Sequence, residues 1–328
     1  MVRVDLSTKA VMEQAKVKRQ LGKDFDGFKD AIGKDGCKVL FLNKGRNFPT
    51  SVSLWGKKEF LRLDPSIMEK AERIVVEENI KLAKEGISGG WKNGEKTAVQ
   101  RVDAVTKDSY VMAIRVRKML FSHILAMNDE PFEKTNNAGM RKLDTNTHVI
   151  TTEKIGGKEF KVILIADRGK KVNDKRMGEK PLCSDGKRQL TLSTNGMVDA
   201  DMLVHPACEI IGRNSLREFG EEANVSGINH ESVVFEGMIV DTQLFTGAYG
   251  IVTSVEVPLT LKEINKLKEN APDSGEIREF EPIEHSTSSI AKFLKDKRKK
   301  CVPQLISGLV VYGYNRYGTD FLKEVTRL

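Results

Sequence analysis

Three glutamates in one short segment are spaced so that they could hold a metal ion: Glu218, Glu221 and Glu222. On a helix, residues three and four positions apart project from the same face. Three carboxylates this close repel one another unless a cation lies among them, and hard oxygen ligands favour Mg²⁺ or Mn²⁺. Such an ion can bridge phosphate oxygens and activate water, as hydrolysis of a phosphoanhydride requires. From the triplet alone, a solvated acidic helix face stays open.

The residues around the triplet extend the pattern. Residues 203–225 read LVHPACEIIGRNSLREFGEEANV. Their spacing resembles the signature of the Nudix hydrolase family, G-x5-E-x7-R-E-U-x-E-E-x-G-U, where U is a bulky apolar residue. Seven of the nine defined positions match, including every charged one: Glu209, Arg217, Glu218, Phe219, Glu221, Glu222 and Val225.

The resemblance implies a Mg²⁺-dependent pyrophosphohydrolase in which Mn²⁺ is a possible substitute. Glu218, Glu221 and Glu222 look like the metal ligands, and Glu218 and Glu222 also look like catalytic residues. Arg217 looks like the structural partner of Glu209, because a bidentate pair between arginine and a carboxylate fixes a plane as well as a distance. We expect this pair to hold the preceding loop against the helix and to orient Glu218.

Two positions depart from the family pattern, since Leu203 and Asn224 stand where the signature has glycine. Asn tolerates the left-handed conformation that ends a helix, so Asn224 can still close it. Leu203 implies a different loop path, in which Gly196 is expected to take over a similar bend. Phe219 is expected to point into the core.

The family often adds one more acidic residue from a later loop, as a base or an extra ligand. Residues 274–281 (SGEIREFE) lie in the corresponding region. Glu276 is our first choice for a third catalytic residue and Glu279 the second, with an exposed acidic loop as the alternative.

The pattern of apolar residues from 146 to 328 predicts alternating strands and helices. This order favours a mixed α/β sandwich, and the resemblance implies an α/β/α sandwich of the Nudix type with a mixed sheet. The expected strands span 159–167, 189–194, 232–240, 249–257 and 277–283, and the expected helices span 210–223, 261–268 and 302–317.

The first half resembles no family that we recognise, and its role is unknown. It is predicted to be mixed and rich in helix, with helices over 7–21, 64–86 and 109–127 and a strand over 37–43. Residues 128–150 are polar and are interpreted as a connection. We accordingly expect two domains, a basic one over 1–145 and a Nudix-like one over 146–328.

The charge of the chain is divided unevenly. Residues 1–150 hold 28 Lys and Arg against 20 Asp and Glu, whereas residues 151–328 hold 26 of each, so all of the net charge of +8 lies in the first half. A basic half indicates RNA or another polyanion as a partner. The alternative is a solubilising surface. The compact basic run KDKRKK at 295–300 is interpreted in the same two ways.

Other features exclude several classes of protein. The sequence has no apolar run long enough to span a membrane and no signal-peptide pattern at its start. Its four cysteines form no CxxC pair, which argues against a zinc site and a disulfide framework and suits a cytoplasmic location.

Two functions remain open. One is hydrolysis of a nucleoside diphosphate linked to another moiety: NAD or ADP-ribose, a sugar nucleotide, a dinucleoside polyphosphate or a capped RNA end. The other is a catalytically inert Nudix-fold protein that binds RNA or a protein partner. Leu203 favours the second, and the intact glutamates favour the first.

Overall fold

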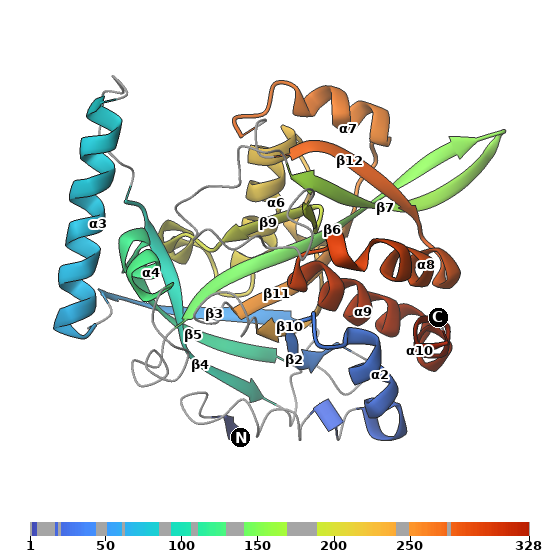
Figure 1. The fold of residues 1–328 in the computed structure, drawn as a ribbon, viewed down its shortest axis with the longest axis horizontal. Helices are drawn as coiled ribbons and strands as arrows, with labels where there is room; N and C mark the ends of the chain where they lie inside the picture. The colour runs from blue at the N-terminus through green and yellow to red at the C-terminus, as the bar shows by residue number, and fades with distance from the viewer. Residues whose placement is uncertain are drawn as a thin grey trace.

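A computed structural model describes residues 2–4, 17–18, 21–43, 51–60, 63–84, 93–105, 111–128, 141–168, 189–240, 249–273 and 277–327. These residues form a mixed α/β fold in which helices cover both faces of a mixed sheet (Figure 1). Within them, no helix is long and apolar enough to cross a membrane.

The described strands join one sheet. They are β1 (Val2–Val4), β2 (Lys38–Leu42), β3 (Ser51–Phe60), β4 (Glu95–Val105), β5 (Val111–Leu120), β6 (Arg141–Ile155), β7 (Lys158–Arg168), β8 (Gln189–Thr191), β9 (Thr194–Met197), β10 (Val234–Val240), β11 (Tyr249–Glu256) and β12 (Ile277–Glu284). The main order is β2-β10-β11-β6-β4-β5-β3, with β7 and β9 paired to β6 and with β12 and β8 paired to β7. The β6–β11 and β3–β5 pairs are parallel, and the other pairs are antiparallel.

Two groups of helices bury the faces of the sheet. The described helices are α2 (Phe25–Ile32), α3 (Pro65–Lys84), α4 (Phe121–Asn128), α6 (Ile210–Ala223), α7 (Leu261–Lys268), α8 (Thr287–Lys297), α9 (Pro303–Tyr317) and α10 (Thr319–Thr326). One core cluster joins α2, α8, α9 and α10 to the sheet through residues such as Phe28, Ile290 and Leu309. A second joins α6 and α7 to it through Phe219 and Ile264. Helices α3 and α4 pack on each other around Ile67 and Ile124.

Most elements expected in the second half are confirmed. Helices α6 and α7 have the predicted bounds, and β7, β10, β11, β12 and α9 differ from their expected ends by one or two residues. In the first half, β2 and α3 are also confirmed. The expected helix over 7–21 lies mostly outside the described residues.

The helix predicted over 109–127 is wrong for its first part, because Val111–Leu120 forms β5. Buried Ile114 and Val116 alternate there with Arg115 and Arg117, of which Arg115 is exposed and Arg117 half-buried. This period of two is typical of a strand with one covered face. Only Phe121–Asn128 is helical.

Residues 141–150 are likewise not a connection, since they belong to the 15-residue strand β6 in the middle of the sheet. The boundary expected at 145/146 falls inside this strand. Strand β2 of the first half also pairs with β10 of the second, and α2 packs against α9 and α10. Whether the two halves fold separately stays a prediction, which limited proteolysis would test.

Candidate active site

Helix α6 carries the acidic residues and owes its position to its apolar face. Ile210, Ile211, Phe219 and Ala223 are buried against the sheet, and Phe219 is fully covered, as predicted. The helix ends at Asn224, whose φ of 55° and ψ of 32° are left-handed and whose N–H donates to the Gly220 carbonyl at 2.9 Å. Asn224 therefore takes the place of a terminal glycine, as expected.

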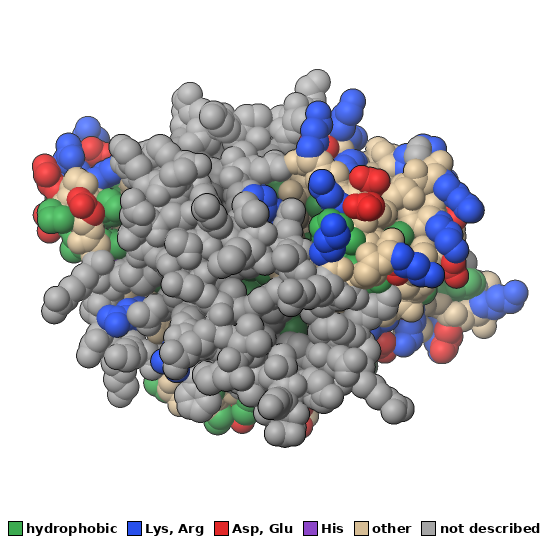
Figure 2. Space-filling model, turned by 90° about the horizontal axis from the view of Figure 1, so that it is seen from below, with side chains coloured by type: hydrophobic (Ala, Val, Ile, Leu, Met, Phe, Trp, Pro, Cys, Tyr) green, Lys and Arg blue, Asp and Glu red, His purple; other side chains and the backbone are tan. Residues whose placement is uncertain are grey.

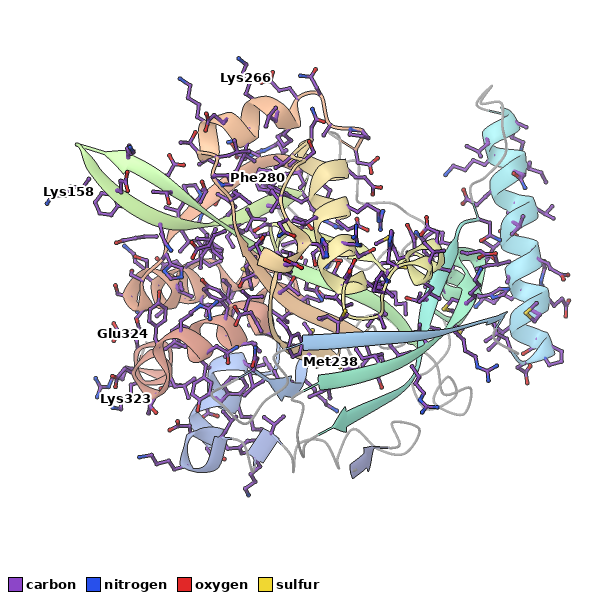
Figure 3. The ribbon with its side chains drawn as sticks, turned by 180° about the vertical axis from the view of Figure 1, so that it is seen from behind. Lys158, Met238, Lys266, Phe280, Lys323 and Glu324 are labelled. Carbon is purple, nitrogen blue, oxygen red and sulfur yellow. The ribbon has the colours of Figure 1, made fainter. Side chains whose placement is uncertain are left out.

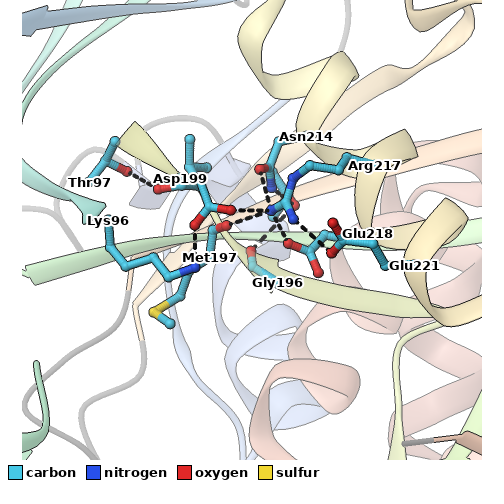
Figure 4. Close-up of polar contacts among 11 residues, drawn as sticks. Lys96, Thr97, Gly196, Met197, Asp199, Asn214, Arg217, Glu218 and Glu221 are labelled. Carbon is cyan, nitrogen blue, oxygen red and sulfur yellow. Dashed lines mark hydrogen bonds and ion pairs between the residues drawn. The ribbon is translucent and has the colours of Figure 1, made fainter. Parts of the chain in front are cut away.

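Arg217 lies at the centre of the polar contacts on α6 (Figure 4). Its Nη1 donates to Oε2 of Glu221 at 2.7 Å. Its Nη2 donates to Oε1 of Glu218, to Oδ1 of Asn214 at 3.0 Å and to the Met197 carbonyl at 3.1 Å, and it lies 3.3 Å from Oδ2 of Asp199. The Arg217 guanidinium therefore contacts carboxylates of α6 and of the segment after β9, and its hydrogen bonds to them are charge-assisted.

The expected pair of Arg217 and Glu209 is not formed, so this prediction is wrong. Glu209 accepts instead from Nε of Arg213 at 2.8 Å, and its carboxylate lies 3.4 Å from Nε2 of His230. The reason is geometric. Glu209 directly precedes α6, and Arg213 is one turn away, whereas Arg217 is two turns away, at about 1.5 Å per residue.

Glu218 projects from α6 towards the sheet and ends over Gly196 of β9. Its side chain is only 12% exposed. A Cβ at position 196 would overlap the Glu218 carboxyl group, so the close approach depends on glycine. Gly196, which we expected to form a bend, belongs to a strand and makes room for this carboxylate.

The surroundings of Glu218 favour its protonated form. Burial raises the pKa of Glu218 to about 7, against the opposing effect of the Arg217 charge, and Glu221 and Asp199 raise it further. A carboxyl group with a pKa near neutrality can both accept and release a proton at physiological pH.

The remaining two glutamates differ in exposure. The Glu221 side chain is 38% exposed, whereas Glu222 is buried at 4%. The donors that the three glutamates offer are all carboxylate oxygens, which fit Mg²⁺ or Mn²⁺. A cation beside Glu218 would also offset the cost of burying its charge. Their oxygens do not converge in this structure: among the described residues, the group with one carboxylate oxygen each within 4.8 Å of one another is Asp167, Glu279 and Glu281, whereas Arg217 contacts both Glu218 and Glu221. The three glutamates fit the metal in the chemistry of their donors, and their assignment as its ligands stays a prediction.

The segment just after α7 contacts α6, since the Asp273 N–H donates to the Glu221 carbonyl at 3.0 Å. Glu276, the first choice for an extra acidic residue, lies outside the described residues. Glu279, the second choice, forms a group with Asp167 and Glu281 in which one oxygen of each lies within 4.8 Å of the others. Arg278 neutralises part of this group, at 3.0 Å from Asp167 and 2.6 Å from Glu279.

Three polar residues of the site were not predicted: Lys96, Asp199 and Asn214. Lys96 comes from β4 in the first half and forms an ion pair with Asp199. Asn214 connects the site to the sheet, because its Nδ2 donates to Oγ1 of Thr145 at 2.9 Å. A sequence signal exists only for Asn214, which lies one turn before Arg217 on the same helix.

Leu203, where the family pattern has glycine, lies in a short 3-10 helix, η5 (Ala200–Val204). Its side chain packs against the core cluster that contains Met202, Ile210 and Ile211. The segment leading to α6 is therefore anchored by an apolar contact in this chain.

No family model matches the chain, and no curated protein matches it. Among solved structures, the chain is similar to a mutT/nudix family protein from Listeria innocua, with 16% identity and a TM-score of 0.32 over 55% of this chain and 94% of that one. A MutT/nudix family protein from Enterococcus faecalis gives 12% identity and a TM-score of 0.28 over 56% and 80%. A complex of T. brucei MERS1 with RNA gives 12% identity and a TM-score of 0.30 over 58% and 67%.

Proposed function

We propose that the chain is a metal-dependent hydrolase that cleaves a nucleoside diphosphate linked to another moiety. The observation that carries the proposal is the arrangement on α6. Glu218, Glu221 and Glu222 share one helix, and Arg217 holds the first two in place. NAD or ADP-ribose, sugar nucleotides, dinucleoside polyphosphates and capped RNA ends are the substrates to be tested.

The chemistry starts from charge. A diphosphate bridge repels hydroxide, so cleavage needs cations on the non-bridging oxygens and an activated water molecule. Mg²⁺ or Mn²⁺ held by Glu218, Glu221 and Glu222 would supply both effects. Water adds to one phosphorus, the bridging P–O bond breaks, and the products are a nucleoside monophosphate and a second phosphorylated compound.

Glu218 suits the role of proton acceptor in this reaction. Without a bound cation, burial raises the pKa of Glu218 to about 7, near the value for efficient proton transfer at neutral pH, and a metal bound to this carboxylate would lower that pKa. Arg217 would help to orient it, because Nη2 of Arg217 donates to Oε1 of Glu218. Glu276 remains the alternative base.

The test is a product screen over these substrate classes with Mg²⁺ and with Mn²⁺. Glu222→Gln should lower turnover by about two orders of magnitude or more, while the exposed Glu269→Gln should leave it unchanged. Activity that survives Glu222→Gln would show that the site is wrongly assigned. A wild-type protein that is inert towards every class would overturn the hydrolase proposal.

The second candidate is a non-catalytic protein that binds RNA or a protein partner. Leu203 favours it, because it stands where the family pattern has the glycine that shapes the loop before the helix, and its side chain packs against the core. Inertness in the product screen, together with metal-independent binding of a partner, would support this candidate. The basic first half and a cytoplasmic location remain proposals under both functions.

A further inference from the structure

A cavity of about 220 Å³ opens beside α2 and β2, among residues that lie on the face of the sheet opposite α6. Apolar side chains contribute much of its wall, among them Val17, Phe25, Phe28, Ile32 and Val39. Lys29, Lys34 and Lys38 complete the lining and are exposed. None of the described residues that line the cavity is Asp or Glu.

The basic run at 295–300 is held next to this cavity by Arg298. Its Nη1 donates to the Ala31 carbonyl at 3.1 Å, and its Nη2 donates to the Ile32 carbonyl. These are two of the last carbonyls of α2, where a cation is favourable. Gly33, which follows them at a φ of 65°, lines the cavity, and a Cβ there would collide with Arg298.

The contacts of Arg298 place the basic run at 295–300 beside a segment of mixed charge, since residues 21–38 hold four Lys and four Asp. Lys295, Lys297, Lys299 and Lys300 flank Arg298 in α8 and η7 (Arg298–Lys300). Nearby Asp35 is partly neutralised by Arg298 at 3.6 Å. In Figure 2, several Lys and Arg side chains lie on one side of the face shown, interspersed with Asp and Glu and with hydrophobic side chains. The basic run at 295–300 therefore belongs to the same surface as the cavity beside α2 and β2, and is not an isolated helix end.

We infer that this surface binds single-stranded nucleic acid, with one base in the cavity and the adjoining phosphates on the lysines. Proteins that bind single strands combine a basic track for the backbone with aromatic or apolar sites for bases. The cavity is smaller than a typical site for a whole small molecule, so it suits one base. Phe25, which is partly exposed, provides the aromatic part, whereas Phe28 is 2% exposed and packs edge-on against Tyr314.

The chemistry of the surface favours a nucleic-acid strand over an anionic membrane. The exposed large hydrophobic residues among the described part of the chain are Val76, Ile80, Val204 and Val234, and none of them borders the cavity. A lipid surface would therefore meet charge without an apolar anchor, whereas stable membrane attachment usually combines both. Lysines, as flexible point charges, suit a row of phosphates.

The first experiment measures fluorescence anisotropy of labelled 12-nucleotide oligouridylate and oligothymidylate between 50 and 200 mM salt, roughly the range in which phosphate contacts weaken. The test variant is Lys29→Gln/Lys34→Gln/Lys38→Gln. We expect it to bind roughly tenfold more weakly and to lower the salt slope by about 2, since each single-strand phosphate contact contributes about 0.7.

The matched control is Lys158→Gln/Lys262→Gln/Lys266→Gln, which removes the same charge. Lys158 and Lys266 lie far from α2 in Figure 3, and all three side chains are exposed. The control should bind nearly as the wild type does. Equal losses in both triple variants, or wild-type binding by the test variant, would overturn the proposed surface.

A second probe tests the cavity without changing the protein. An abasic 12-mer has the same phosphates but no bases, and loss of one stacked base weakens binding by roughly 5- to 150-fold. We expect the wild type to prefer the oligonucleotide with bases, and Glu222→Gln to show the same preference, since this site is independent of α6. Equal affinity for both strands, or tighter lysine-dependent binding to vesicles of anionic lipid, would refute the proposal.

Discussion

Gly196→Ala should disturb the candidate site through a single methyl group. The new Cβ would overlap the Glu218 carboxyl group, which must then move away from Arg217. A hydrogen bond between charged groups contributes about 1.5–3 kcal/mol to stability. We expect Gly196→Ala to lower the free energy of unfolding by about 2 kcal/mol.

The cause can be isolated by a double-mutant cycle in urea denaturation. In a Glu218→Ala background, the three atoms that lie nearest to the new methyl group at position 196 are absent. Gly196→Ala should then be neutral, or stabilising by about 0.4–1 kcal/mol, because alanine restricts the unfolded chain. The coupling free energy between the two substitutions is therefore expected to be about 2 kcal/mol or more.

Gly94→Ala is the matched control, since a Cβ there meets only the end of the Lys96 side chain at 4.0 Å. It should change stability little and show no coupling to Glu218→Ala. If Gly196→Ala and Glu218→Ala are instead additive to within about 0.5 kcal/mol, the contact between strand β9 and this carboxylate does not exist in solution.

Three further predictions concern other buried polar groups. Burial lowers the pKa of His148 to about 4 from 6.5. The free energy of unfolding should therefore fall by roughly 3 kcal/mol as the pH falls from about 6.5 towards 4, and this pH dependence should be absent in His148→Phe. Arg316→Ala should destabilise the fold by about 3–5 kcal/mol in urea denaturation, because it leaves the buried Glu236 carboxylate without the cation 2.6 Å away, and Glu236→Gln should recover part of the loss. Arg217→Ala should raise the rate of hydrogen exchange in β9 and α6 far more than in the rest of the chain, and it should lower the free energy of unfolding in urea by about 2 kcal/mol. An equal increase in exchange rate across the whole chain would contradict the local role of Arg217.

The second half could be predicted well because local signals there agree with the fold. Helix α6 has an apolar stripe that ends at Phe219 and Ala223, followed by a residue suited to left-handed backbone. The helix prediction over β5 came from Val111, Ile114 and Met119, because Val111 lies three residues before Ile114 and eight before Met119, as on one face of a helix. The alternation of Ile114 and Val116 decides the matter only once their burial is known.

Strand β6 was missed for a different reason, since its centre is polar and yet buried. Thr145, Asn146, Thr147 and His148 are each at most 1% exposed. Their burial depends on partners distant in sequence, such as Thr253, whose hydroxyl lies 2.9 Å from that of Thr147. A sequence shows polarity but not such partners, so the segment resembled a connection.

In the candidate site, too, some features could be predicted from the sequence and others could not. The spacing of Glu218, Glu221 and Glu222 could be read from the sequence, but the partner of Arg217 could not. The resemblance implied Glu209, whereas the structure supplies Asp199 and Asn214. Lys96 reaches the site from another half of the chain, through a contact that no local pattern encodes.

The most direct test of the central claim is a calorimetric titration of Mn²⁺ into the protein near pH 7.5. We predict saturable binding by the wild type that is abolished in Glu221→Gln/Glu222→Gln and preserved in the control Glu269→Gln. No binding by the wild type, or equal binding by the double variant, would show that the acidic face of α6 is not a metal site.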